Sequence, residues 1–244
     1  MTSVELDRFG PVGDRRWMLV DPAGRFVSQR EEARMARLDA LLVDGGINLG
    51  FAGTQLQAET PQSGNTLPVQ IWGDTVTARD AGDEAAAWLS EHFQRPLRLV
   101  HMPEDSHRAV DPDYARHGET VSFADGFPLL LLSESSLDEL NPRLSVPVTL
   151  DRFRPNLVVS GCPPHAEDGW RRIRIGDVEF SVAKPCARCA VPSLDQMTGE
   201  KHPDILRALA GYRRREDRQV YFGQNLLYSQ PGTLRVGDAV EVLD

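Results

Sequence analysis

The sequence predicts a β-rich α+β protein with a β-barrel core and an N-terminal subdomain that is also barrel-like. Gly-Asp pairs stand close to β-branched residues at Gly73-Asp74, Gly176-Asp177 and Gly237-Asp238. Each pair favours a tight turn in which glycine relieves backbone strain, so three hairpins are expected. Helical patterns are few, and no period of about 20–50 residues runs through the chain. Recurrent hairpins with few helices are typical of a β-barrel or a similar closed sheet.

The N-terminal part carries mostly strand signals. The runs Arg16–Val20 and Arg25–Gln29 flank the turn signal Asp21–Gly24, which predicts a hairpin. The polar, alternating stretch Asn48–Arg79 also favours strands. A helix is expected next, because apolar residues recur at helical spacing between Ala85 and Phe93. It follows acidic start signals at positions 80–83 and should stop before Pro96.

The remaining elements follow from length and flanking residues. The charged stretch His101–Glu119 has no clean period and predicts a long loop. Phe127–Leu132 is a strand-sized apolar run, and Ser133–Ser136 offers N-caps for a short helix that Pro142 ends. A β-rich stretch is expected over Val146–Val182.

Composition excludes several functional classes. The 244 residues include 27 Lys and Arg against 36 Asp and Glu, so the formal charge is −9. This acidic balance argues against a nucleic-acid partner, because phosphate contacts need surplus cations. No apolar run approaches the ~20 residues of a membrane helix, so no membrane association is expected. The N-terminus lacks a basic start and an apolar core, so the cytoplasm is the expected location.

The motif with the most chemical content is a C-x-x-C pair formed by Cys186 and Cys189. With Cys162 and His165 it would supply the four ligands of a zinc site. Alternatively, Arg188 between the cysteines would lower a thiol pKa in a thiol–disulfide motif. A third reading makes one thiolate the ligand of a soft, redox-active metal. The simplest reading is two small buried residues, the usual fate of free cysteine.

Charged neighbours bear on the third reading. Lys184 and Arg188 would hold a thiolate and any anionic group of a cofactor. The residues alone leave the alternatives open. The three cysteines are an odd number, which fits free thiols or ligands better than a disulfide framework.

Several stretches, in this order and spacing, resemble the MOSC family in its two-part form with an N-terminal β-barrel domain. They are Gly13–Val20 with Gln29–Glu31; Phe153–Val159; Ala166–Asp168 with Trp170 and Ile175–Asp177; Lys184–Cys189 running to Asp195 and Thr198-Gly199; and Phe222–Asn225 with Gly232 and Val236–Asp238. Within that family the chain is most similar to amidoxime-reducing components and bacterial reductases of N-hydroxylated bases. The resemblance covers nearly the whole chain.

The resemblance implies a molybdenum cofactor, with molybdenum ligated by Cys189 as the catalytic residue and by the dithiolene of molybdopterin. It also implies a set of cofactor-binding residues. Arg15 and Arg154 would grip the pterin or its phosphate, and Ser133, Ser136 and Asn156 are weaker candidates. Arg30 and Arg188 would add to the positive pocket. The residue types suit this chemistry, because a guanidinium forks onto phosphate oxygens and a thiolate suits a redox metal.

The expected domains are a MOSC N-terminal β-barrel-like domain over residues 1–100 and a MOSC domain over residues 101–244. The implied activity is N–O reduction of a small N-hydroxylated substrate. Electrons would come from a separate ferredoxin-, flavodoxin- or cytochrome-type protein, because three cysteines cannot hold a four-cysteine cluster. The alternative is a cofactor or sulfur carrier without turnover, with Cys186 carrying the sulfur. The wider family is also associated with proteins that bind pyridoxal phosphate.

One departure from the family pattern is expected to matter. Family members usually begin with a strand that contains Tyr-Pro-x-Lys-Ser, whose Lys and Ser contact the cofactor. This sequence starts after that point.

Overall fold

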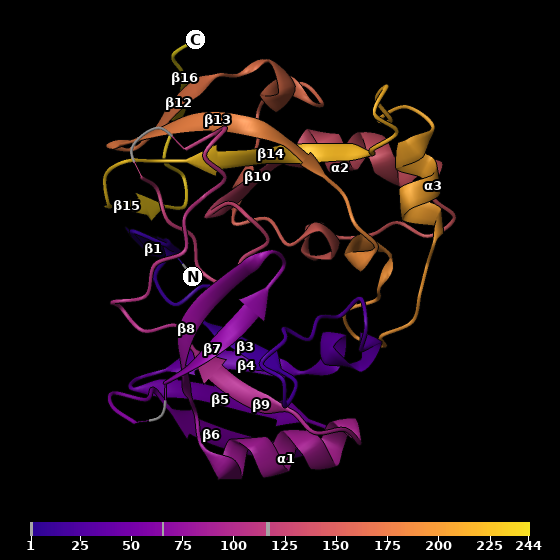
Figure 1. Ribbon diagram of the computed structural model, residues 1–244. Coiled ribbons are helices and arrows are strands. Elements are labelled where there is room, and N and C mark those ends of the chain that lie inside the picture. The colour runs from indigo at the N-terminus through magenta and orange to yellow at the C-terminus, as the bar shows by residue number, and fades with distance from the viewer. Residues whose placement is uncertain (1, 65, 116–117) are drawn as a thin grey trace.

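The structure is a computed structural model of the chain, and it describes all residues except 1, 65 and 116–117. Its strands form two halves (Figure 1). The N-terminal half, indigo to magenta, lies below the C-terminal half, orange to yellow. The β-rich α+β class is therefore confirmed.

The N-terminal half contains two antiparallel sheets. The four-stranded sheet has the order β3 (Trp17–Val20), β9 (Arg98–His101), β8 (Asp74–Asp80), β7 (Thr66–Ile71). The three-stranded sheet has the order β4 (Asp39–Val43), β5 (Gly46–Phe51), β6 (Thr54–Glu59). A short 3₁₀ helix, Ala33–Arg37, connects the two sheets along the chain.

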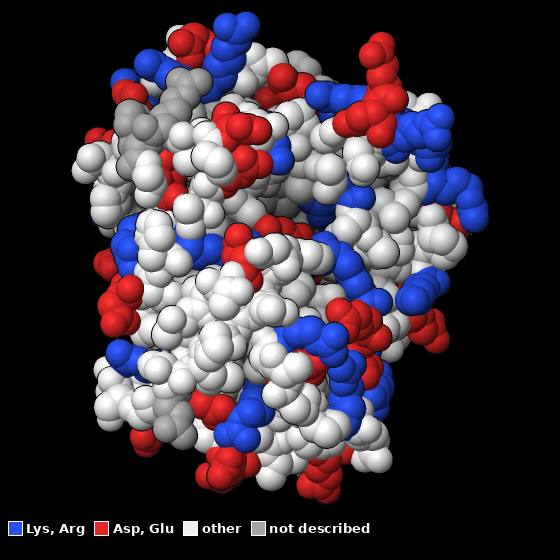
Figure 2. Space-filling model, viewed as in Figure 1, with Lys and Arg blue, Asp and Glu red and all other residues white. Residues whose placement is uncertain are grey.

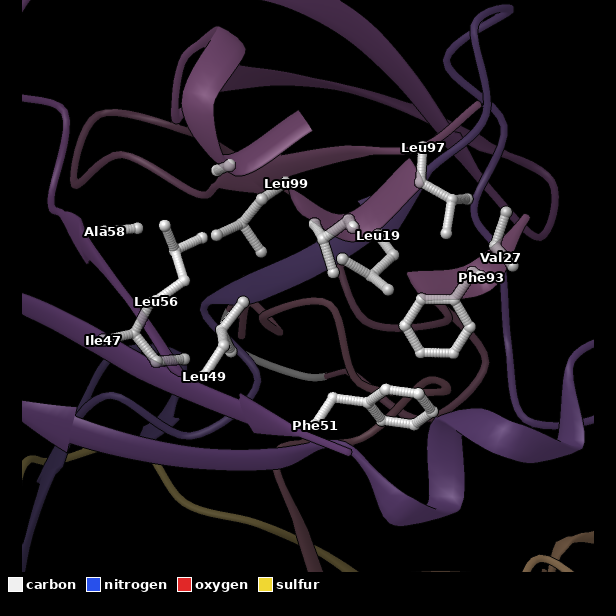
Figure 3. Packing of buried hydrophobic residues seen from close by; sticks show 12 residues of the cluster. Leu19, Val27, Ile47, Leu49, Phe51, Leu56, Ala58, Phe93, Leu97 and Leu99 are labelled. Carbon is white, nitrogen blue, oxygen red and sulfur yellow. The ribbon is translucent and has the colours of Figure 1, made fainter. Parts of the chain in front are cut away.

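Helix α1, Asp83–Phe93, packs against these sheets as its spacing predicts. Ala85, Leu89 and Phe93 are buried on one face of the helix, in a core shared with the strands. The ring centroids of Phe93 and of Phe51 in β5 lie 4.9 Å apart. Figure 3 shows the two rings next to each other in this core. The helix ends at Gln94 in a left-handed conformation, two residues before the proline expected to stop it.

The C-terminal half is built on a six-stranded sheet. Its order is β11 (Leu157–Val159), β10 (Leu129–Ser133), β14 (Tyr221–Leu227), β13 (Val178–Ala187), β12 (Arg172–Ile175), β16 (Val240–Val242). Neighbours are antiparallel except β10 and β11. Helix α2 (Glu134–Leu140) follows β10, and α3 (Asp204–Ala210) lies near the beginning of β14 (Figure 1).

A small fourth sheet joins the two ends of the chain. Strand β1, Ser3–Asp7, lies between β15, Gly232–Arg235, and β2, Gly10–Pro11. Leu6 of β1 and Leu234 of β15 are buried in the core of the C-terminal half. The first strand is therefore fixed by a partner more than 220 residues away in the sequence.

Two of the three expected Gly-Asp hairpins are confirmed. Gly73 lies in the turn between β7 and β8, and Gly176-Asp177 forms the turn between β12 and β13. The third expectation is wrong, because Gly237-Asp238 connects β15 to β16 and these strands belong to different sheets. Strand β15 pairs with β1 instead, and β16 pairs with β12.

The hairpin expected over residues 16–29 is confirmed only next to its turn. The amide of Val27 donates to the carbonyl of Leu19 at 2.8 Å, the amide of Asp21 donates to the carbonyl of Arg25 at 2.8 Å, and an antiparallel bridge joins Val20 to Phe26. Along its full length, however, strand β3 pairs with β9. The stretch Val146–Val182 is less β-rich than expected, because it includes the 3₁₀ helices Leu150–Phe153 and Ala166–Gly169. The expected loop after residue 101 is irregular where it is described, and residues 116–117 lie outside the described residues.

Candidate functional site

A cleft of about 590 Å³ lies where the two halves of the molecule meet. Its walls come from the N-terminal residues 15–49 and Leu99, and from the C-terminal residues 123–130, 153–156, 186–191 and 225. Figure 2 shows a hollow between the upper and lower parts of the molecule, with Lys or Arg side chains in its walls. Most of the residues singled out in the sequence line this cleft: Arg15, Arg30, Arg154, Asn156, Cys186, Arg188 and Cys189.

Arg15 enters the cleft from the connection between β2 and β3. Its backbone is left-handed, with φ 50°, and its carbonyl accepts a hydrogen bond from the amide of Phe123 at 3.0 Å. Its guanidinium forms an ion pair with Asp14 and donates a hydrogen bond to the carbonyl of Arg154 at 3.3 Å. Arg15 therefore reaches from the N-terminal half to the C-terminal half.

Arg154 enters the cleft at the end of the 3₁₀ helix Leu150–Phe153, again in a left-handed conformation with φ 55°. Among the described residues, no hydrogen-bond or ion-pair partner is found for its guanidinium. Burial by the walls of the cleft and the charge of Arg15 lower its pKa. Because arginine ionises far above neutral pH, the group remains a cation. A guanidinium without a counter-ion, beside a second guanidinium, is a site for an anion.

Arg188 lies between the two cysteines of the C-x-x-C pair and ties them to the Arg154 segment. Its Nη1 donates a hydrogen bond to Sγ of Cys186 at 3.2 Å, and its Nη2 donates to the carbonyl of Phe153 at 2.8 Å. Its buried Nε has no partner among the described residues. Burial raises the pKa of the Cys186 thiol despite the nearby charge of Arg188, so Cys186 is a neutral thiol at physiological pH.

Cys189 has a different environment, next to Arg30. Partial burial acts to lower the pKa of Arg30, but contact with Cys189 and the charge of Asp125 outweigh it and raise that pKa. The Arg30 guanidinium lies 3.1 Å from Asp125 and 4.4 Å from the ring centroid of Trp72. The Cys189 thiol therefore lies in the cleft beside a cation that is itself fixed on two sides.

Asn156 holds the site together with both ends of its side-chain amide. Its Oδ1 accepts a hydrogen bond from the amide of Leu130 at 3.0 Å, and its Nδ2 donates to Asp14 at 2.9 Å. The structure places Asn156 in the cleft lining, and its role toward a cofactor stays a prediction. Its amide is already occupied by protein partners, so it orients neighbours.

Ser133 and Ser136 do not line the cleft, and the expectation that they share it is corrected. Both are fully buried at the start of α2 and bind the buried carboxylate of Glu167. Ser133 Oγ donates to Glu167 at 2.9 Å, and Ser136 Oγ donates to it at 3.2 Å. Although Ser133 is the N-cap residue, its side chain makes no capping hydrogen bond. The pair stabilises a buried acid.

The structure also corrects the expectations for Lys184 and for zinc. The Lys184 ammonium lies 4.6 Å from the ring centroid of Tyr114 and is absent from the cleft lining, so it holds no thiolate there. Cys162 packs against the core of the C-terminal half, and His165 contacts Tyr212. In the part of the chain that the structure describes, no three His, Cys, Asp or Glu residues gather as metal ligands. The four-ligand zinc alternative is therefore wrong.

Two acidic residues of the site were missed from the sequence. Asp14 stands next to Arg15 in the stretch Gly13–Val20, but nothing local in the sequence shows that it also binds Asn156. Asp125 lines the cleft and pairs with Arg30, 95 residues away in the sequence. Only its position just before the buried strand β10 could have drawn attention to it.

The residues present fit the cofactor that the sequence resemblance implied. An anion site is available at Arg154 and Arg15, and Arg188 offers a further unsatisfied N–H. A thiol that can ligate a soft metal lies in the same cleft. These groups match a ligand that carries an anionic group at one end, for the guanidinium groups, and a soft metal at the other end, for the thiol.

The fold and the cleft define a β-rich protein in two halves, with thiol and guanidinium groups gathered where the halves meet. Two family models match the chain. A MOSC N-terminal β-barrel domain matches residues 1–96, and a MOSC domain matches residues 118–241. The chain belongs to the MOSC family, and the resemblance stated from the sequence is confirmed.

Named relatives match along nearly the whole chain. The chain is 35% identical over 252 residues to mitochondrial amidoxime-reducing component 1 of Mus musculus, covering 97% of this chain and 74% of the relative. It is 35% identical over 256 residues to the same component of Homo sapiens, with coverage of 97% and 74%. It is 30% identical over 259 residues to molybdenum cofactor sulfurase of Bos taurus, covering 95% of this chain and 29% of the relative.

Solved structures give partial matches. A solution structure from Bordetella bronchiseptica is 25% identical and covers 37% of this chain and 74% of its own, with a TM-score of 0.33. A crystal structure of YuaD protein from Bacillus subtilis is 15% identical and covers 55% and 73%, with a TM-score of 0.38. Within the described residues, no helix is long and apolar enough to cross a membrane.

Two sequence expectations gain no support from these comparisons. The amidoxime-reducing relatives carry the word mitochondrial in their names, so the cytoplasmic location stays a prediction. Nothing in the matches supports the association with pyridoxal phosphate.

Proposed function

We propose that this protein is a molybdenum-cofactor-dependent reductase of small N-hydroxylated compounds. The observation that carries the proposal is one cleft that holds the Cys189 thiol together with the unpartnered Arg154 guanidinium. The names of the relatives support the same activity, since amidoxime reduction is the chemistry they state. The reaction consumes two electrons and two protons, breaks the N–O bond and releases the oxygen as water.

In this proposal each cleft residue has a defined task. Cys189 ligates molybdenum, while Arg15 and Arg154 bind the phosphate of the pterin. Arg30 and Arg188 add positive charge, and Asn156 binds the backbone of Leu130 in the cleft wall. When bound, the cofactor supplies the two-electron redox chemistry, and the protein supplies binding, orientation and electrostatics.

The protein part of the mechanism concerns charge and protonation. Arg30 places a fixed positive charge beside the sulfur of Cys189. Arg188 keeps Cys186 as a hydrogen-bond acceptor, while burial keeps that thiol protonated. Asp125, exposed at the cleft and paired with Arg30, is placed to bind a cationic amidine product. The apolar wall at Trp17, Ile47 and Leu49 excludes water from one side.

Electrons would come from a separate ferredoxin-, flavodoxin- or cytochrome-type protein. Three cysteines cannot supply the four thiolates of a cluster in this chain. The division into domains at residues 1–100 and 101–244 is proposed on the same footing. The two matched ranges support it, while the pairing of β1 with β15 ties the first strand to the C-terminal half.

The alternative is a cofactor or sulfur carrier without turnover, in which Cys186 carries the sulfur. The relationship to a molybdenum cofactor sulfurase favours it. The raised pKa of Cys186 opposes it, because a sulfur carrier acts through its thiolate.

A reductase assay tests the proposed function. Protein made in cells that produce the cofactor is given an artificial one-electron donor and an aromatic N-hydroxylated amidine, and the amidine is quantified by chromatography. Repeated turnover by the wild type, abolished in Cys189→Ser and retained in Cys186→Ser, supports the proposal. A molybdenum-loaded wild type that forms no amidine, amine or other N–O reduction product contradicts it and leaves the carrier.

A further inference from the structure

Asp14 is a charged residue of the site that has no task in the function proposed above. Its Oδ2 accepts a hydrogen bond from Nδ2 of Asn156 at 2.9 Å and forms the ion pair with Nη1 of Arg15. Its own amide donates to the carbonyl of Pro11 at 2.9 Å, which fixes the turn between β2 and β3. A single carboxylate oxygen thus receives donors from both halves of the molecule.

The partners of Asp14 lead directly to the two arginines of the anion site. Asn156 is held by Leu130 through two hydrogen bonds, from its amide to the carbonyl of Leu130 at 2.8 Å and from the Leu130 amide to its Oδ1 at 3.0 Å. Arg15 extends past Asp14 to the carbonyl of Arg154 at 3.3 Å. The chain of contacts from Leu130 through Asn156, Asp14 and Arg15 therefore ends at the residue that carries the unpartnered guanidinium.

If only its charge mattered, Asp14 would weaken anion binding at this site. Asp14 and Asp125 both act on the Arg154 guanidinium through space, and each favours its charged form. A carboxylate beside an anion site repels the anion, so removing either charge should strengthen anion binding if the two acids differ only in position. The two acids differ in their contacts, however, because Asp125 pairs with Arg30 and not with Arg15.

We propose that Asp14 is a positioning residue of the anion site: its carboxylate holds Arg15 and Asn156 so that the Arg15 and Arg154 guanidinium groups meet one anionic group together. The inference rests on the anion site of the proposed function and adds to it a residue that acts through Arg15. The orientation it provides outweighs its repulsion of the anion. A guanidinium with a long flexible stem loses much of its forked geometry when no partner fixes it.

Binding of inorganic phosphate to the full chain, made without the cofactor, tests this inference. Calorimetry at fixed pH and ionic strength gives the dissociation constant for the wild type, Asp14→Ala, Asp14→Asn and the matched control Asp125→Asn. We expect Asp14→Ala to weaken binding about tenfold although it removes a negative charge. Asp14→Asn keeps an oxygen acceptor and should restore most of the affinity. Asp125→Asn should strengthen binding about two- to threefold.

The outcomes distinguish a positioning role of Asp14 from a purely electrostatic one. Tighter phosphate binding by Asp14→Ala, matching Asp125→Asn, would overturn the inference, as would equal weakening by Asp14→Asn and Asp14→Ala. Thermal melts without phosphate show which variants are folded, and Asp14→Asn carries the test if Asp14→Ala is not. A wild type that binds no phosphate overturns the anion site and the inference with it. A wild type that shows the expected pattern but reduces no N-hydroxylated compound contradicts only the proposed function.

Discussion

Arg188 donates a hydrogen bond to Sγ of Cys186 at 3.2 Å, and this contact distinguishes the two cysteines of the C-x-x-C pair. Cys186, which is partly exposed, contacts a guanidinium that also donates to the carbonyl of Phe153. Cys189, three residues on, faces Arg30 in the cleft. Two identical side chains in one motif therefore have different neighbours, Arg188 beside Cys186 and Arg30 beside Cys189.

We predict different alkylation rates for the two thiols. In cofactor-free protein at pH 7.5, a small alkylating reagent should modify Cys189 at least several-fold faster than Cys186, because burial raises the pKa of Cys186 and lowers its thiolate fraction. Mass spectrometry of the separate Cys186→Ser and Cys189→Ser variants follows each thiol alone. Equal rates for the two thiols would show that Cys186 is not the shielded residue.

Arg154 should contribute to ligand binding and little to stability. Arg154→Ala is expected to change the free energy of unfolding by less than about 0.5 kcal/mol, because its guanidinium has no partner among the described residues. Phosphate affinity and molybdenum content should fall together. Arg152→Ala is the matched control: it loses an ion pair to Asp195 at 2.6 Å and should cost about 1 kcal/mol in urea unfolding. A large loss of stability in Arg154→Ala would place that guanidinium in the fold.

Ser133 and Ser136 should affect stability without affecting the cofactor. Each donates to the fully buried Glu167, so Ser133→Ala and Ser136→Ala each leave a carboxylate oxygen short of a donor, at a cost of about 1–3 kcal/mol. Urea unfolding measures the loss, and Ser63→Ala, at an exposed position, is the control. Molybdenum content per folded molecule should be unchanged. A specific loss of molybdenum would return these serines to the site.

His101 should make the protein less stable in mild acid. Burial and the charge of Arg16 lower its pKa from 6.5 to about 4 in the folded state. The unfolded chain therefore binds a proton that the folded chain excludes between these values. The stabilisation is complete above pH 6.5 and is lost as the pH falls towards 4, by about 1–2 kcal/mol after allowance for partial exposure.

The matched pair for this prediction is His101→Phe and His107→Phe. A phenyl ring keeps a stacking partner for Trp17, which lies 4.7 Å from the His101 ring centroid, but it does not titrate. The difference in unfolding free energy between pH 7 and pH 4.5 should shrink in His101→Phe and remain in His107→Phe, where the histidine is exposed. An unchanged pH dependence in His101→Phe would assign the acid sensitivity to other groups.

Local signals in the sequence predicted local structure well. Helix α1 was predictable because Ala85, Leu89 and Phe93 define a buried face within three turns. The turn at Gly176 was predictable because both strands of its hairpin are adjacent in the sequence. The turn at Gly237 was not, since the strands on either side pair with β1 and β12, and no local pattern encodes those distant partners.

The same difference between local signals and distant partners applies to the residues of the site. The resemblance placed Arg15, Arg154 and Cys189 in one list, and the structure brings them into one cleft. It misassigned Ser133, whose acceptor Glu167 lies 34 residues away. It gave no task to Asp14, because the value of that carboxylate depends on Asn156, 142 residues further along the chain. Partners so distant in sequence become visible only when the fold is known.

The central claim is that Cys189 in this cleft holds the molybdenum of the cofactor. Its most direct test is elemental analysis of the wild type, Cys186→Ser and Cys189→Ser, all purified from cells that make the cofactor. We predict near-stoichiometric molybdenum in the wild type and in Cys186→Ser, and a small fraction of that amount in folded Cys189→Ser. Molybdenum retained in Cys189→Ser but lost from Cys186→Ser, or absent from all three folded proteins, would contradict the account.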